Sequence, residues 1–168
     1  MKSLEEIRSE VDRMASVIGA SDYAYLPTYG SSRDGAHPHI EVYSTAYHWV
    51  VVERGHERDR FSTTEFDALL ERVFTSVTFG LATAYELAHR VEPTDCRRLI
   101  FQHQIELLSL LSPSWAQAEA ERHVRILRSH PFDDFSGVRA SFTRELRESG
   151  SAPDIAWQTA CHRYPLPE

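Results

Sequence analysis

Cysteine is scarce in this sequence of 168 residues, which contains only Cys96 and Cys161. Two cysteines are too few for a disulfide framework, and neither lies in a CxxC or comparable zinc-binding spacing. Glycine is also scarce, and no GxGxxG, GxxxxGK[ST] or GxSxG motif is present. Apolar runs are far shorter than the roughly 18 residues that span a membrane. These absences disfavour disulfide-stabilised, nucleotide-dependent and membrane-spanning proteins, and they leave no marked nucleophile.

Lysine is nearly absent, since Lys2 is the single example, but arginine brings the basic residues to 18 against 25 acidic ones. The resulting net charge of −7 repels a phosphate backbone, so we expect no nucleic-acid partner. The N-terminal segment MKSLEEIRSEVDRM is amphipathic and acidic, unlike a secretory signal. We therefore predict a cytoplasmic protein with no membrane partner. Its length and its 42% of hydrophobic residues fit one domain over residues 1–168.

Helical spacing of apolar residues is present along most of the chain. Ser3 and Glu6 have the spacing of a capping box, and the apolar repeat that follows predicts a helix to Ile18. Ser62 and Glu65 have the same spacing and open the longest predicted helix, which ends near His89. Further helices are predicted from Thr94 or Asp95 to Leu111, from Pro113 to residue 129, over Gly137–Ser149 and over Asp154–His162.

The helix that begins at Pro113 is predicted to turn its apolar residues toward the core. That inward set is Trp115, Ala118, Val124 and Leu127, and the outward set is Glu119, Glu121 and Arg122.

The segment between the first two helices is rich in β-branched and aromatic residues. It predicts an antiparallel meander with strands near His39–Tyr43, Tyr47–Glu53 and Glu57–Phe61, and a weaker fourth over Tyr23–Tyr29. Alternation places Tyr47 and Trp49 on one face of the sheet and His48 on the other, and one of these two faces should pack on the long helix. For the remaining face we favour coverage by the first helix over an open docking surface. The fold class is thus α+β, mostly α: a small meander of three to four strands on about four to six helices.

Two carboxylate–imidazole pairs stand at helical spacing, Glu86 with His89 and His103 with Glu106. Such pairs form metal sites in helical bundles, but the complete pattern needs carboxylates on two further helices. No such pair is present, so exposed polar residues or a buried hydrogen-bonded pair explain them better. We expect no metal, no cofactor and no catalysis. A small metal-assisted hydrolase that uses these four residues is the alternative.

Aromatic and acidic residues at one end of the meander form the candidate surface for a protein partner, because aromatic side chains anchor interfaces and acidic ones attract basic partners. The turn HPFDD adds two carboxylates, although Phe132 as a core plug and Asp133 or Asp134 as a helix cap is the favoured interpretation there. The candidate partner-binding residues are Tyr43, Tyr47, His48, Trp49, Glu53, Glu57, Asp59, Asp133 and Asp134.

Four segments between about Ile40 and Asp134 share a recognisable order: HIEVYSTAYHWVVVERGHE, ERVFTSVTFGLATAYELAHR, RRLIFQHQIELLSLLSPSWAQ and HPFDD. In this order, and in the LSPSW corner and PFDD turn, the chain resembles the immunity protein 63 family of bacterial polymorphic toxin systems. The resemblance implies a protein that binds a cognate secreted toxin and neutralises it by stoichiometric occlusion, which protects the producing bacterium. An adaptor for another cellular protein is the remaining alternative. The oligomeric state and the toxin's activity are left open.

Overall fold

The computed structural model describes residues 1–20 and 24–167. Within them the chain forms six helices and a four-stranded sheet, which confirms the predicted α+β class. In chain order the elements are α1 (Leu4–Val17), β1 (Thr28–Tyr29), β2 (His37–Val42), β3 (Tyr47–Glu53), β4 (His56–Thr63), α2 (Phe66–Ala88), α3 (Cys96–Leu111), α4 (Pro113–Ser129), α5 (Ser136–Glu148) and α6 (Pro153–Arg163).

The sheet has the order β1-β2-β3-β4, and β2, β3 and β4 form the predicted antiparallel meander. Arg54 and Gly55 close the β3–β4 hairpin with positive φ angles, the conformation of a tight two-residue turn. The prediction for the fourth strand is wrong in length and direction, because β1 has two residues and pairs parallel to β2. Its predicted first residue, Tyr23, lies outside the described residues.

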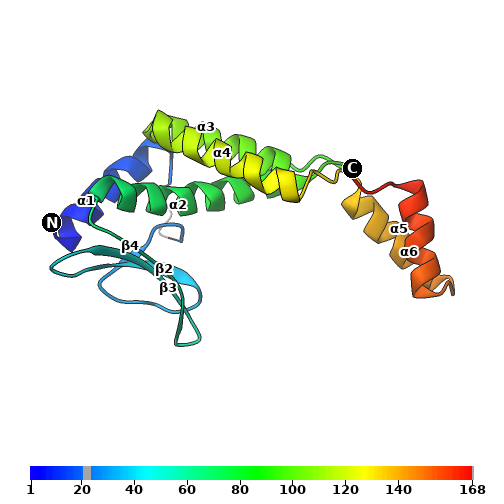
Figure 1. Ribbon diagram of the computed structural model, residues 1–168, viewed down its shortest axis with the longest axis horizontal. Helices are drawn as coiled ribbons and strands as arrows, with labels where there is room; N and C mark the ends of the chain where they lie inside the picture. The colour runs from blue at the N-terminus through cyan, green and yellow to red at the C-terminus, as the bar shows by residue number, and fades with distance from the viewer. Residues whose placement is uncertain (21–23, 168) are drawn as a thin grey trace.

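The molecule is layered, with α2 between the sheet on one side and α3 and α4 on the other (Figure 1). Ile40, Tyr47 and Trp49 project from the inner face of the sheet into one apolar core with residues of α1 and α2. We expected α1 to cover the outer face, and this is wrong. The apolar stripe of α1 packs instead on the inner side of the sheet, which faces the other helices, and there α1 contacts β2 and α3. The outer face has no helix on it among the described residues; Tyr43 there is 57% exposed, but His39 and Val50 on the same face are buried.

Among the predicted side-chain caps, those at Ser3 and Asp95 are confirmed and the one at Ser62 is wrong. Ser3 and Glu6 form the capping box of α1, and the Asp95 carboxylate caps α3 by accepting from the Arg97 amide. The cap predicted at Ser62 does not form, because β4 continues through that residue and its hydroxyl lies 2.7 Å from Nδ1 of His48 on β3. The Ser62 hydroxyl is therefore paired with His48 across the strands and does not cap α2.

The buried face of α4 differs from the prediction. Trp115 is buried as expected, but Val124 is 50% exposed and Ala118 is exposed, whereas Glu119 and His123 are buried. The physical reason is that Glu119 and His123 pair with each other inside the protein. A polar residue on α4 is therefore not necessarily an exposed one.

Helices α5 and α6 form a hairpin that projects from the layered body (Figure 1). They pack mainly on each other, and the apolar core cluster of the described residues includes none of their side chains. The hairpin is instead fastened by a set of ionic and hydrogen-bonding residues at its base. We name this set the polar joint; it consists of Asp95, Arg97, Arg98, Asp133, Asp134 and Arg139.

Asp95 is the centre of the polar joint. Its carboxylate accepts from the amide of Asp133 at 2.9 Å and from the Arg97 guanidinium at 2.6 Å, and its own amide donates to Asp134 at 2.9 Å. Burial of the Asp95 carboxyl opposes its ionisation, but Arg97 and the two amide donors outweigh burial and lower its pKa to about 2. The joint therefore favours the charged form of Asp95.

Phe74→Ala should lower the free energy of unfolding by about 3–5 kcal/mol, because it empties a site in α2 that is fully buried between the sheet and α4. Leu110→Ala on α3 is the control, since Leu110 is 62% exposed and should change stability by less than about 0.5 kcal/mol. Urea denaturation of both variants measures the difference. Equal losses at the two positions would contradict the layered core.

Asp95→Asn should cost about 2 kcal/mol at neutral pH, which follows from a pKa of about 2 in the folded protein against an ordinary value of 3.8. Because the folded pKa is the lower one, this stability is present above pH 3.8 and is lost as pH falls toward 2. Chemical denaturation from pH 2 to pH 7 should show the variant and wild type converging at the acidic end. Glu145→Gln, an exposed change on the hairpin, should leave the whole pH profile unchanged.

Candidate functional site

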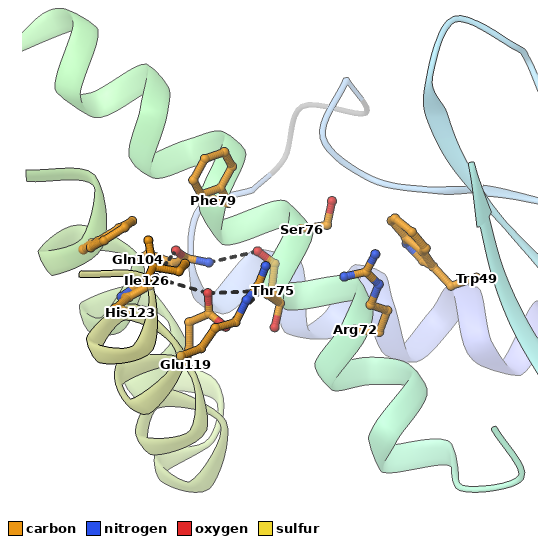
Figure 2. Close-up of a pocket in the computed structure, with 11 residues that line it drawn as sticks. Trp49, Arg72, Thr75, Ser76, Phe79, Gln104, Glu119, His123 and Ile126 are labelled. Atoms are coloured by element: carbon orange, nitrogen blue, oxygen red, sulfur yellow. Dashed lines mark hydrogen bonds and ion pairs between the residues drawn. The ribbon is translucent and has the colours of Figure 1, made fainter. Parts of the chain in front are cut away.

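A groove runs along α2 between the sheet and α4, and it is the candidate site. It consists of two adjoining hollows that share Arg72, Thr75, Glu119 and Arg122. Trp49 forms the sheet-side wall of one hollow and Phe61 that of the other, while α4 forms the opposite wall (Figure 2). We refer to the two hollows together as the α2–α4 groove.

A buried polar network forms the helical wall of the groove. Nε2 of His123 lies 3.1 Å from Oε1 of Gln104 and 3.2 Å from Oε1 of Glu119, both of which are acceptors, so this nitrogen carries the proton. The amide nitrogen of Gln104 donates in turn to the carbonyl of Thr75 on α2 at 3.1 Å. Phe101 stacks on the His123 ring with centroids 3.8 Å apart. The network thus fixes α3 and α4 against the middle of α2.

Glu119 is held in its charged form within this network. Burial of its carboxyl opposes ionisation, but the hydrogen bond from His123 and the charge of Arg122 outweigh burial and lower the pKa. Arg122 reaches the same carboxylate from the groove side at 3.4 Å. Sequence reasoning assigned Glu119 to the outward face and therefore missed this wall.

The sheet-side wall is built by an arginine and a tryptophan. The Arg72 guanidinium lies over the Trp49 ring, 4.0 Å from its centroid, and pairs with the Asp59 carboxylate at 2.5 Å. Trp49 is only 5% exposed, and its indole N–H has no acceptor within the described structure. A buried donor without a partner costs about 1–3 kcal/mol, so this wall holds an unsatisfied hydrogen-bonding group.

Glu71 is the uncompensated carboxylate of the groove. It makes no hydrogen bond or ion pair with any residue that the structure describes, whereas Glu119 in the same hollow has Arg122 and His123. Burial and the negative charges of Asp67 and Glu119 raise the pKa of Glu71. In the free protein the surroundings of Glu71 therefore disfavour the charged form of its carboxyl group.

The aromatic candidates from the sequence divide between the two faces of the sheet. Trp49 lines the groove, and Tyr47 is buried, with its hydroxyl accepting from the Lys2 amide at 2.7 Å. Tyr43 and His48 lie on the outer face, where their rings make an edge contact at 5.1 Å. The structure thus does not gather these residues into one surface.

The acidic candidates at the sheet end are each paired with an arginine. Glu53 lies 3.5 Å from Arg58, and Glu57 lies 2.7 Å from Arg60. Asp59 belongs to the groove through Arg72. The acidic rim predicted from sequence is therefore largely neutralised by the protein itself.

The two carboxylates of the HPFDD turn belong to the polar joint. Asp133 pairs with the buried Arg139, and Asp134 pairs with Arg98 at 2.8 Å. Neither caps α5, whose N-cap residue is Phe135 with no side-chain hydrogen bond, so the predicted cap is wrong. Phe132 is half-buried, with Arg98 over its ring, and lies outside the apolar core cluster of the described residues.

The four residues of the alternative metal site do not converge. The Tyr85 ring stacks on His89 at 4.0 Å and on His103 at 4.1 Å, so it lies between the two imidazoles. The Glu86 carboxylate is held by Arg90 at 2.9 Å. Across residues 1–20 and 24–167, no three histidine, cysteine or acidic side chains are grouped as ligands for one ion.

Glu71→Gln should stabilise the free protein by a few tenths of a kcal/mol at neutral pH, because it removes a charge that its surroundings oppose. Since the folded pKa is raised, wild type loses stability relative to the variant as pH rises above about 4.5, and the two should coincide at lower pH. Denaturation between pH 3 and pH 7 measures the difference. Glu121→Gln on the exposed surface of α4 is the control, and a Glu71→Gln variant that is less stable than wild type would contradict the assignment.

Comparison with protein families gives a match to the Immunity protein 63 family over residues 43–125, which is about half of the chain. Comparison with curated proteins and with solved structures gives no match. No helix within the described part of the chain is long and apolar enough to cross a membrane. The matched residues include β3, β4, α2, α3 and most of α4, and with them nearly the whole lining of the α2–α4 groove. The segment that builds this groove thus matches the Immunity protein 63 family, as the sequence resemblance predicted.

Proposed function

We propose that this protein is an immunity protein that binds a cognate secreted toxin and neutralises it by stoichiometric occlusion. The observation that carries the proposal is the match of residues 43–125 to the Immunity protein 63 family. The protein would act as a single domain in the cytoplasm of the producing bacterium and protect that cell. Its net charge of −7 would speed association with a basic toxin by long-range attraction.

The groove supports binding in preference to catalysis. Apart from Glu71 and Arg125, the charged groups discussed above are engaged with one another: Arg72 with Asp59, and His123 with Glu119 and Gln104. A general base or a nucleophile must be free to reach a substrate. Side chains that are paired in this way instead present a fixed shape and charge, which is the requirement for occluding another protein.

The test is co-expression with the toxin encoded by the adjacent gene. Cells that make the toxin alone should stop growing, and cells that also make this protein should grow. The purified partners should form a complex of fixed stoichiometry in size-exclusion chromatography with light scattering. A wild-type protein that neither binds nor protects against that toxin contradicts the proposed function.

A further inference from the structure

The α2–α4 groove leaves some of its own charge without a partner among the described residues. Most charged side chains around it are paired, but Glu71 on the α2 side and Arg125 on the α4 side are not. Neither forms an ion pair with any described residue, although both line the same hollow. A partner that brings the opposite charges would compensate both groups.

The Trp49 wall adds an ordered anchor next to these two charges. Its side chain is buried in the wall beside Arg72, and its N–H lacks an acceptor in the described structure. Tryptophan and arginine are also the side chains that most often dominate the binding energy of protein interfaces. The stacked Arg72 is held in place by Asp59, so this anchor is already ordered in the free protein.

We propose that the toxin docks in the α2–α4 groove and places a basic side chain against Glu71. The same toxin segment supplies a carboxylate to Arg125 and packs against Arg72, whose guanidinium covers the enclosed Trp49 ring. This inference rests on the proposed function and adds the surface and the chemistry of the contact. The occupant is a segment of a basic protein, which agrees with the acidic charge of this chain.

The other candidate surfaces offer less to a basic partner. At the sheet end, Glu53 and Glu57 are already neutralised by Arg58 and Arg60. A toxin arginine placed there would compete with an internal pair, whereas one placed at Glu71 would meet a carboxylate without a cation.

The experiment measures binding of the full-length protein to the toxin domain encoded by the adjacent gene, inactivated so that it can be purified. Glu71→Lys should raise the Kd about tenfold or more, as expected for a like-charge contact in an interface. Glu71→Gln should raise it severalfold, although this variant should be no less stable than wild type. Arg125→Glu, which reverses the unpaired charge on the α4 side of the same hollow, should raise the Kd about 3–10-fold.

Glu121→Lys is the matched control, because it makes the same change of charge at an exposed position of α4 outside the groove and should alter the Kd less than about twofold. Circular dichroism and urea denaturation verify that each variant is folded. If Glu71→Lys proves unfolded, the Glu71→Gln and Arg125→Glu variants decide.

Three results would overturn the inference. Binding that is lost in Glu57→Lys and kept in Glu71→Lys would place the toxin at the sheet end. A wild-type dimer in light scattering that Glu71→Lys dissociates would assign the groove to a second copy of this chain. Wild-type protein that does not bind the toxin at all would remove the proposed function as well, so this failure is distinct from the first two.

Discussion

Burial of α2 on two opposite sides is the constraint on which the rest of the structure depends. The sheet packs on one side of this helix and α3 with α4 on the other, so Leu69, Val73 and Phe74 are almost completely removed from water. A helix enclosed in this way leaves only narrow polar flanks at the seams between its neighbours. Glu71 and Arg72 lie on one such flank, and the α2–α4 groove is the seam. The position of the candidate site therefore follows from the packing of the core.

A polar network replaces part of the apolar contact between α2 and its helical neighbours. Gln104, Glu119 and His123 are all buried, and their hydrogen bonds connect α4 through α3 to the backbone of α2. Such a network is directional, unlike apolar contact, so it fixes the rotation of α4 as well as its distance. This rotation decides which α4 residues reach the groove.

Features set by local spacing could be predicted from the sequence, and features set by distant partners could not. The capping box at Ser3, the β2–β4 meander and the order of the helices depend on residues a few positions apart, and all are found. The cap at Ser62 failed because strand pairing with His48 competes for the same hydroxyl. The prediction of the buried face of α4 was wrong because Glu119 pairs with His123, and His123 also bonds to Gln104 on α3. The four-residue spacing of those two on one helix was a signal that they pair, but not that they face inward.

The α5–α6 hairpin is attached to the rest of the protein through the polar joint and not through the apolar core. Its attachment depends on a few specific ion pairs and hydrogen bonds, such as Arg139 with Asp133 and, in turn, the Asp133 amide with the Asp95 carboxylate. Apolar side chains on the hairpin have no counterpart in the core cluster of the described residues, so a change there does not force the layered body to repack. The sequence of the hairpin should consequently be free to diverge between relatives as long as Arg139 and its partner Asp133 remain. Variation in this protein should therefore accumulate in the hairpin before it reaches α2.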